Sequence, residues 1–200
     1  MIQLVWLDLC SGLGGASQPA LDRGWRVIRV DIDPRFKPDI VADVRDPLPL
    51  RELRPTVLWA SSVCTDFSKW GLRCFFPNPP EPDLSIAKGC YSANEQMKPD
   101  YWFHENVLAA RPFLNPIFGP PRIVTTGHVL WTNFGLLLPN IKPHKGAIRT
   151  GLIYKGKKPG WGPMNHGKSR GDSHQRAAKI PYEIGEAICA AVERRVEEAA

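Results

Sequence analysis

The stretch IQLVWLDLCSGLGGASQPALDRG, residues 2–24, decides the fold class. It opens with an apolar run that reaches Asp8, continues through the glycine-rich segment SGLGGAS, and ends in QPALDRG, which is compatible with a short helix. This succession predicts a strand, a sharp turn and a helix. Units of this kind build parallel sheets that are covered by helices.

Further apolar runs repeat the pattern along the chain. Three of them are WRVIRVDID, DIVADV and TVLWAS, at residues 25–33, 39–44 and 56–61. A fifth run, YWFHENV, starts at Tyr101, and RIVTTGHVLWTNF at 122–134 suits a closing hairpin. We therefore expect an α/β, Rossmann-like fold with a mostly parallel sheet, a closing antiparallel hairpin, and a functional site at the carboxyl ends of the strands.

Two further segments have a distinct character. Residues 181–198, PYEIGEAICAAVERRVEE, carry apolar side chains at helical spacing with charges on the other face, which predicts an amphipathic C-terminal helix. Residues 72–100 are rich in proline early on, at FFPNPPEPD, and we interpret them as a mobile loop over a site.

The positive charge of the chain is concentrated in residues 135–179. This segment holds ten lysines or arginines against one acid, Asp172, so its charge is +9; the whole chain carries +6, which leaves −3 on the rest. A basic segment on an acidic body is typical of a protein with a polyanionic partner, because Lys and Arg release counterions from phosphates. A solvated basic loop is the alternative.

Length and cysteine content limit the class of protein. Two hundred residues suffice for one α/β domain with an appendage. The five cysteines are widely spaced and form no CxxC pair, so we expect no disulfide framework, no metal site and a reducing compartment, the cytoplasm. The N-terminus has no basic region before its apolar run, and no run approaches the length of a membrane span, so we expect no membrane partner.

The glycine segment and the acids after it suggest a nucleoside site. Gly12, Gly14 and Gly15 would let a ligand lie against bare backbone, and Asp31 would accept hydrogen bonds from two ribose hydroxyls. Asp43 could accept from an adenine amine. An adenosine cofactor without phosphates and NAD both stay open, as does a simple turn with acids that cap helices.

Cys64, in WASSVCTDFSKWG at 59–71, is a candidate nucleophile. Taken alone it is better explained as a small buried side chain, since free cysteines are commonly buried. At the carboxyl end of the fourth strand, however, it would face Glu105 from the adjacent strand. A thiolate beside a carboxylic acid suggests covalent catalysis on an electron-poor ring, with the acid at a ring nitrogen.

Together these motifs resemble the DNA cytosine-5 methyltransferase family in its compact, phage and viral form. The resemblance runs through DLCSGLGG, VDID, ADV, VCTDFS, HENV and an Arg-x-x-x-Ile-Pro sequence before the last helix. It implies three parts: residues 1–134 as the catalytic and cofactor-binding core, 135–179 as a short basic target-recognition segment, and 180–200 as a helix that returns to the core. A monomer is expected.

The resemblance implies a fold that binds S-adenosyl-L-methionine. The implied cofactor residues are Asp8, Cys10, Gly12, Gly14, Gly15, Asp31, Ile32, Asp43, Val44 and Lys179. It also implies that Cys64 attacks C6 of a flipped cytosine in DNA while Glu105 engages N3 and the exocyclic amine.

The chain departs from this family at four positions. Val63 replaces a proline before the nucleophile, and Cys10 replaces an aromatic residue against the adenine. His128 stands at or near an arginine that contacts the cytosine carbonyl, with Arg122 as the rival. Lys179 stands near the transferred carbon, where it would pair with an anion.

The first function that follows is transfer of a methyl group to C5 of cytosine in DNA. Lys179 raises the alternative that carboxy-S-adenosyl-L-methionine is the donor and that a carboxymethyl group is transferred. A contact of this lysine with DNA phosphate or with the cofactor carboxylate is the simpler interpretation. A catalytically degenerate nucleic-acid-binding module stays open as well, and so does the same chemistry on RNA or a pyrimidine nucleotide.

Overall fold

The computed structural model describes residues 3–46, 48–50, 52–71, 78–125, 127–136, 138 and 180–199. Nearly all of the basic segment expected at 135–179, including Lys179, lies outside the described residues, so its role stays a prediction. Among the described helices, none is long and apolar enough to cross a membrane.

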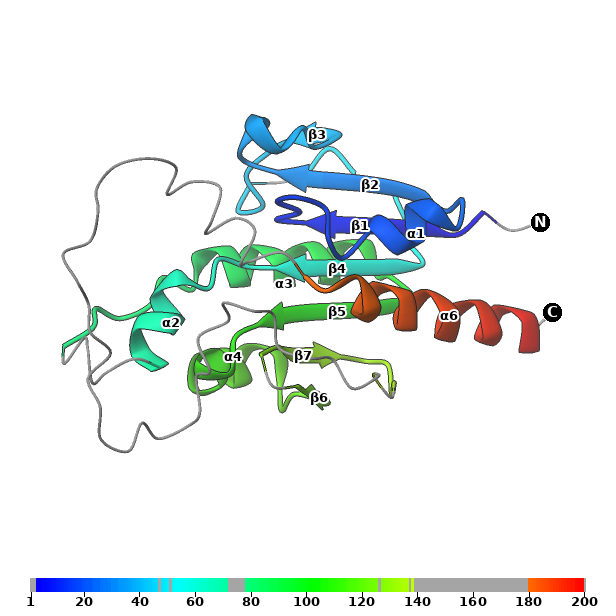
Figure 1. The fold of residues 1–200 in the computed structure, drawn as a ribbon. Helices are drawn as coiled ribbons and strands as arrows, with labels where there is room; N and C mark the ends of the chain where they lie inside the picture. Colours follow the sequence, from blue (N-terminus) through cyan, green and yellow to red (C-terminus); the bar gives the residue numbers. More distant parts are fainter. Residues whose placement is uncertain are drawn as a thin grey trace, which may run out of the picture.

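A seven-stranded sheet forms the centre of the described chain, in the order β3-β2-β1-β4-β5-β7-β6. The strands are β1 Val5–Leu9, β2 Arg26–Asp31, β3 Ile40–Val41, β4 Val57–Ser61, β5 Tyr101–Asn106, β6 Ile123–Val124 and β7 Val129–Thr132. The pairs from β3 to β5 are parallel, and β7 runs antiparallel to both β5 and β6. The expected α/β fold with a mostly parallel sheet and a closing hairpin is confirmed (Figure 1).

Helices cover both faces of the sheet (Figure 1). One face carries α1 Gln18–Asp22 and the C-terminal helix α6 Tyr182–Glu198, which confirms the predicted amphipathic helix. The opposite face carries α3 Ser85–Met97 and α4 Arg111–Phe118. The short helix α2, Thr65–Gly71, follows β4, and two short 3-10 helices, η1 Pro34–Phe36 and η2 Leu108–Ala110, lie in loops.

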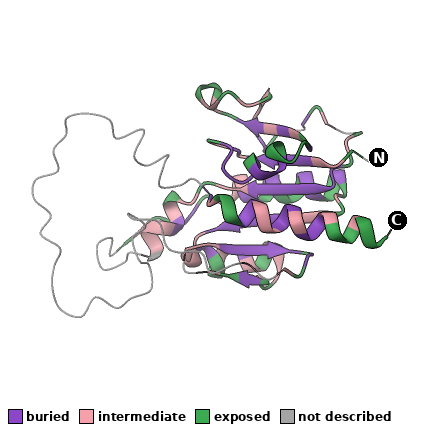
Figure 2. Ribbon diagram, turned by 45° about the vertical axis from the view of Figure 1, so that its right-hand side comes forward, coloured by how far each residue is buried: buried purple, intermediate pink, exposed green. Residues whose placement is uncertain are grey.

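The core has a layer on each face of the sheet, because successive strand residues point to opposite faces. Under α6, the rings of Trp6, Trp59 and Phe103 stack across β1, β4 and β5 with centroids 6.3 and 6.2 Å apart. Under α3, Leu7 and Leu58 belong to a second buried cluster with apolar side chains of that helix. Figure 2 shows that burial concentrates on the strands and on the side of α6 that faces them.

The interpretation of residues 72–100 as a loop was wrong for its second half. Residues 85–97 form α3, while 72–77 lie outside the described residues. Ala87, Cys90, Ala93 and Met97 recur at helical spacing and are buried against the sheet. Burial of this stripe stabilises the helix, and the prolines end before it begins.

Close contact between α1 and α6 depends on Gly185. A Cβ at this position would lie 2.2 Å from the backbone oxygen of Ala16 and 3.0 Å from Cγ of Pro19. Ion pairs from Arg23 of the loop after α1 to Glu186 and Glu193 of α6 hold the same contact from the outside.

We expect Gly185→Ala to destabilise the fold by about 2 kcal/mol, because overpacking costs about 1–3 kcal/mol and outweighs the helix propensity gained. Urea unfolding would measure the change. Gly127→Ala is the matched control, since an added Cβ there meets nothing within 4 Å. A stability of Gly185→Ala equal to that of the wild type would contradict the close contact.

His104 makes the fold sensitive to acid. Its side chain is buried in β5, its ring stacks on Phe118 with centroids 4.2 Å apart, and its Nε2 has no partner among the described residues. Burial lowers the pKa of His104 to about 3. The unfolded chain therefore takes up a proton on this ring below about pH 6.5 while the folded chain does not, and stability falls as the pH falls through this window.

Replacement of His104 by phenylalanine should remove this dependence. Relative to wild type, the free energy of unfolding of His104→Phe should rise by about 2 kcal/mol between pH 7 and pH 5. Asp8, whose pKa burial raises to about 7, acts in the opposite sense in both proteins and cancels from the difference. Urea unfolding of both proteins at each pH measures it; a difference that does not change with pH would refute the prediction.

Candidate functional site

The carboxyl ends of β1, β2, β4 and β5 lie at one edge of the sheet, on the side where α2 lies (Figure 1). The parallel pairing of these strands makes this inevitable, since parallel strands share their direction. The glycine loop, Asp31, Cys64 and Glu105 all follow or close these strands. The sequence-predicted residues therefore gather at one edge.

The glycine loop after β1 is tied to β2 on both sides. The backbone N–H of Gly12 donates to Oδ2 of Asp31 at 2.8 Å, and Arg29 donates to the carbonyl oxygen of Gly12 at 2.6 Å. Gly14 has a φ of +70°, and a Cβ there would lie 2.9 Å from Nε of Arg29. Glycine suits both conditions, because a side chain here would be strained and would displace Arg29. Arg29, which sequence reasoning missed, is a charged residue within an apolar strand, and that exception was the available signal.

Asp31 keeps acceptor capacity toward the edge of the sheet. It is 8% exposed, and its Oδ1 accepts the N–H of Asp33 at 2.9 Å. A carboxylate has about four acceptor positions, so the two backbone bonds leave room for two hydroxyls. Ile32 beside it is 61% exposed and Leu13 of the glycine loop 45% exposed, so both present apolar surface there.

These features fit an adenosine-type ligand. Ribose hydroxyls suit the free lone pairs of Asp31, and an aromatic base would cover the exposed side chain of Ile32. Ser11 supports the fit, because its Oγ is buried in the loop and has no hydrogen-bond partner among the described residues. An orphaned hydroxyl of this kind is expected where a ligand completes a site.

Two other predicted cofactor residues, Asp8 in β1 and Cys10 directly after it, form contacts within the protein. Asp8 is buried and accepts from Oγ of Ser17 at 2.5 Å; burial raises its pKa to about 7. Cys10 has a φ of 56° and packs in the same apolar cluster as Cys90 of α3; interaction with the Cys90 thiol and burial raise the pKa of Cys10. Both residues therefore stabilise the glycine loop through contacts within the protein, and Cys10 packs toward α3.

Asp43 is occupied by its neighbour. Both carboxylate oxygens accept from the guanidinium of Arg45, and the backbone N–H of Arg45 donates to Oδ1, which together lower the pKa of Asp43 to about 2. An adenine amine would have to share this carboxylate. The sequence alone does not show whether Asp43 is paired with Arg45 or is free to bind a ligand.

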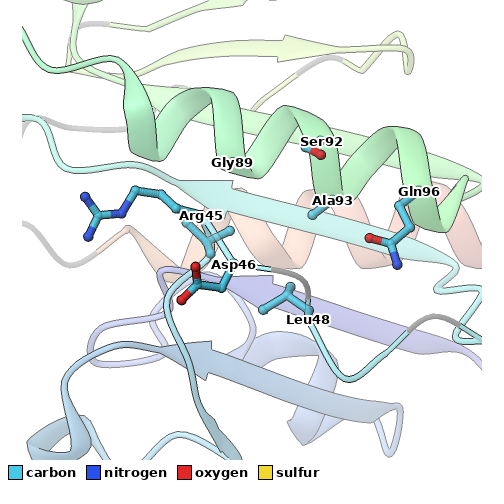
Figure 3. Close-up of a pocket in the computed structure, with 8 residues that line it drawn as sticks. Arg45, Asp46, Leu48, Gly89, Ser92, Ala93 and Gln96 are labelled. Carbon is cyan, nitrogen blue, oxygen red and sulfur yellow. The ribbon is translucent and has the colours of Figure 1, made fainter.

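Val44 lines a hollow of about 370 Å³ between the loop after β3 and helix α3 (Figure 3). Its other lining residues are Arg45, Asp46, Leu48, Gly89, Ser92, Ala93 and Gln96. A Cβ on Gly89 would lie 2.7 Å from the carbonyl oxygen of Val44, so this glycine permits the close approach of helix and loop. Among the predicted cofactor residues that the structure describes, only Val44 lines the hollow.

Cys64 and Glu105 come from the ends of adjacent strands. Ser61 of β4 is opposite Glu105 of β5, and Cys64 follows three residues later. Burial raises the pKa of the Cys64 thiol, and the charge of Glu105 raises it further. The two groups therefore interact electrostatically at the same edge of the sheet.

His128 contacts Glu105, so its Nδ1 is already used and is not free to bond a substrate. Its Nδ1 lies 2.8 Å from Oε1 of Glu105, whose side chain is only 9% exposed. Burial alone would lower the pKa of His128, but the hydrogen bond and the charge of Glu105 outweigh burial and raise it. The rival Arg122 is exposed, and it precedes β6, which β7 separates from β5.

Asn106 holds the loop that carries the cysteine. Its side chain is fully buried, and its Nδ2 donates to the carbonyl oxygen and the Oγ of Ser62 at 2.9 and 3.1 Å. Sequence reasoning did not assign this residue a role, although its position directly after Glu105 was visible. Val63, between the anchored Ser62 and Cys64, is 58% exposed.

No group of three or more His, Cys, Asp or Glu side chains suited to a metal ion occurs among the described residues. The expected contribution of Lys179 lies outside them.

Comparison with known proteins gives structural similarities only. No protein-family model matches the chain, and no curated protein matches it. One similar solved structure is a candidate DNA modification methyltransferase encoded within an E. coli prophage, with 16% identity and a TM-score of 0.46 over 65% of this chain and 46% of that one.

Two more similar structures are the Entamoeba histolytica methyltransferase EhMeth and the glycopeptide N-methyltransferase MtfA in complex with S-adenosyl-L-methionine. EhMeth has 18% identity and a TM-score of 0.41 over 71% of this chain and 58% of its own. MtfA has 17% identity and a TM-score of 0.36 over 53% and 48%. The chain thus spans about half the length of the structures that it matches, and its fold class rests on its own strand order.

Proposed function

We propose that this protein transfers a methyl group from S-adenosyl-L-methionine to C5 of cytosine in DNA, through a covalent bond between Cys64 and C6 of the base. The observation that carries the proposal is the cluster of Cys64, Glu105 and His128 at the sheet edge that also holds the glycine loop and Asp31. A nucleophile, an acid and a nucleoside-binding loop at one edge are the parts that this reaction needs.

The cofactor residues of the proposal are those around the glycine loop. Asp31 would hold the ribose, Ile32 would cover one face of the adenine, and Ser11 would donate or accept at the rest of the ligand. When bound, the sulfonium supplies an electrophilic methyl group. Supporting roles around this loop are proposed for Asp8, Gly12, Gly14, Gly15 and Val44, whereas Cys10 and Asp43 are engaged by Cys90 and Arg45.

Cys64 and Glu105 would act as a coupled pair. Attack of the thiolate at C6 forms the S–C6 bond, and a proton from Glu105 to N3 takes up the charge that attack releases into the ring. C5 can then accept the methyl group; solvent water takes the C5 proton, the S–C6 bond breaks with its electron pair returning to Cys64, and N3 returns its proton to Glu105. A protonated Glu105 lacks the negative charge that raises the pKa of Cys64, so the acid form of Glu105 favours the thiolate.

DNA is the proposed substrate because the basic segment at 135–179 suits a polyanion and a flipped base would expose C5 and C6. RNA and pyrimidine nucleotides contain the same cytosine ring, so an experiment must distinguish them from DNA as substrates. Lys179 in that segment leaves carboxymethyl transfer as a variant of the proposal, and a degenerate binding module is the outcome if no transfer occurs.

Nucleoside mass spectrometry tests the proposal. The protein is incubated with duplex DNA, RNA or cytidine triphosphate, and with S-adenosyl-L-methionine or its carboxy form. We expect 5-methylcytosine in DNA with the methyl donor. A carboxymethyl product would identify the other donor. Binding of DNA without any modified nucleoside, under conditions where calorimetry shows the cofactor bound, would support the binding module and refute the enzyme.

A further inference from the structure

We infer that His128 is a positioning residue that acts on the reaction through Glu105 and makes the acid step depend on a titratable cation. The inference deepens the proposed function and rests on it.

The geometry pairs His128 with Glu105. Nδ1 of His128 and Oε1 of Glu105 are 2.8 Å apart, and both side chains are largely withdrawn from water, with 23% and 9% exposed. This bond uses one oxygen of Glu105 and one ring nitrogen of His128. No described residue bonds the second oxygen, Oε2, which could therefore meet N3 of a substrate ring.

The hairpin fixes this arrangement. Glu105 pairs across the sheet with Leu130, and Asn106 pairs with Val129, so His128 directly precedes the part of β7 that lies beside them. The backbone N–H and carbonyl oxygen of His128 are both bonded to Thr125, through its Oγ1 at 2.9 Å and its N–H at 2.8 Å. A backbone held at both groups aims the imidazole at β5.

The charged state of the pair changes during the proposed reaction. When Glu105 transfers its proton, its O–H bond breaks, an N3–H bond forms, and a carboxylate remains. An imidazolium at Nδ1 stabilises that carboxylate, whereas a neutral imidazole does so weakly. When the product forms, N3 returns the proton and the pair regains its starting charge.

Among the charged and titratable groups near His128, Glu105 is the one that favours its charged form. The strand β5 beside His128 contributes Glu105. The loop after β4 contributes Cys64, which interacts electrostatically with Glu105. In the hairpin, the exposed Arg122 forms no ion pair among the described residues. Burial disfavours the imidazolium and Glu105 favours it, with a raised pKa of His128 as the net result. The cation is thus present below this pKa and lost above it.

Two measurements on the full chain test the inference. The first is the pH profile of single-turnover methylation of a duplex oligonucleotide with S-adenosyl-L-methionine. Titration of Cys64 and Glu105 is common to all variants, so each rate is compared with that of His128→Arg, whose cation does not titrate. Relative to His128→Arg, wild type should lose rate about tenfold per pH unit above the pKa of His128, whereas His128→Gln should be slower by a factor that does not change with pH in this range. A decline in His128→Arg equal to that of wild type overturns the inference.

The second measurement does not depend on activity. The pKa of the His128 imidazole is followed by NMR in wild type and in Glu105→Gln. We expect the proton affinity of His128 to fall at least tenfold in Glu105→Gln, with His104 neutral in both proteins as an internal control. An unchanged titration would show that the pair does not form. Absence of methylation in every protein, with the NMR change present, would refute the proposed function and the catalytic part of the inference but leave the pair itself established.

Discussion

Cys64→Ser is expected to abolish methyl transfer, with a loss of about 10³-fold or more in the single-turnover rate, because a serine hydroxyl is a far weaker nucleophile than a thiolate. The substitution changes one atom, so the fold should be retained. Cofactor affinity should also be retained, because Cys64 follows β4 and is not part of the glycine loop. The rate is measured with saturating S-adenosyl-L-methionine and a duplex oligonucleotide.

The control for Cys64→Ser is the removal of a different thiol, that of Cys189. Cys189 is buried in α6, on the face of the sheet that packs against α1, and Cys189→Ala should keep the wild-type rate at a temperature where it is folded. Calorimetric binding of the cofactor and thermal melting separate a lost nucleophile from a lost site. A Cys64→Ser protein that methylates DNA within tenfold of wild type would mean that Cys64 is not the nucleophile.

Asp31→Ala is expected to weaken binding of S-adenosyl-L-methionine by about 100-fold or more, since each hydrogen bond to a buried charged group contributes about 1.5–3 kcal/mol. The substitution removes the proposed ribose acceptors. It also leaves the N–H of Gly12 without the carboxylate that holds it at 2.8 Å. Isothermal titration calorimetry of the cofactor gives the affinity directly.

Asp33→Ala provides the matched control for Asp31→Ala. Asp33 lies two residues further on, and its carboxylate is paired with exposed Arg35 at the surface. Its removal should change cofactor affinity by less than about twofold, as surface ion pairs contribute little. Equal losses of cofactor affinity in Asp31→Ala and Asp33→Ala would mean that the ribose does not bind Asp31. The loss of affinity would then come from a change in the whole loop.

Much of the fold could be predicted because the strands are apolar runs that end in polar or acidic residues. Such runs place Asp31, Cys64 and Glu105 at one edge of a parallel sheet before any coordinates are known. Helix α3 was missed because the prolines just before it dominated the interpretation of the segment, although its buried stripe, from Ala87 to Met97, has helical spacing.

The partners of the site residues were harder to predict, since they depend on tertiary contacts. The pairing of Glu105 with His128 follows from the register of β5 and β7, and the contact of Cys10 with Cys90 follows from the packing of α3 on β1. A single sequence contains neither the register nor the packing. Asp43 shows the same limit at short range, because its bond to Arg45 depends on the local turn.

Covalent trapping tests the central claim most directly. The protein is incubated with S-adenosyl-L-methionine and a duplex oligonucleotide that contains 5-fluorocytosine, whose fluorine cannot leave C5 as a proton does, so the thiol cannot be eliminated. We predict a denaturation-resistant complex with wild type, with the base attached at Cys64 in the digested protein, and no complex with Cys64→Ser. A complex that persists in Cys64→Ser, or no complex with wild type although the cofactor binds, would contradict the account.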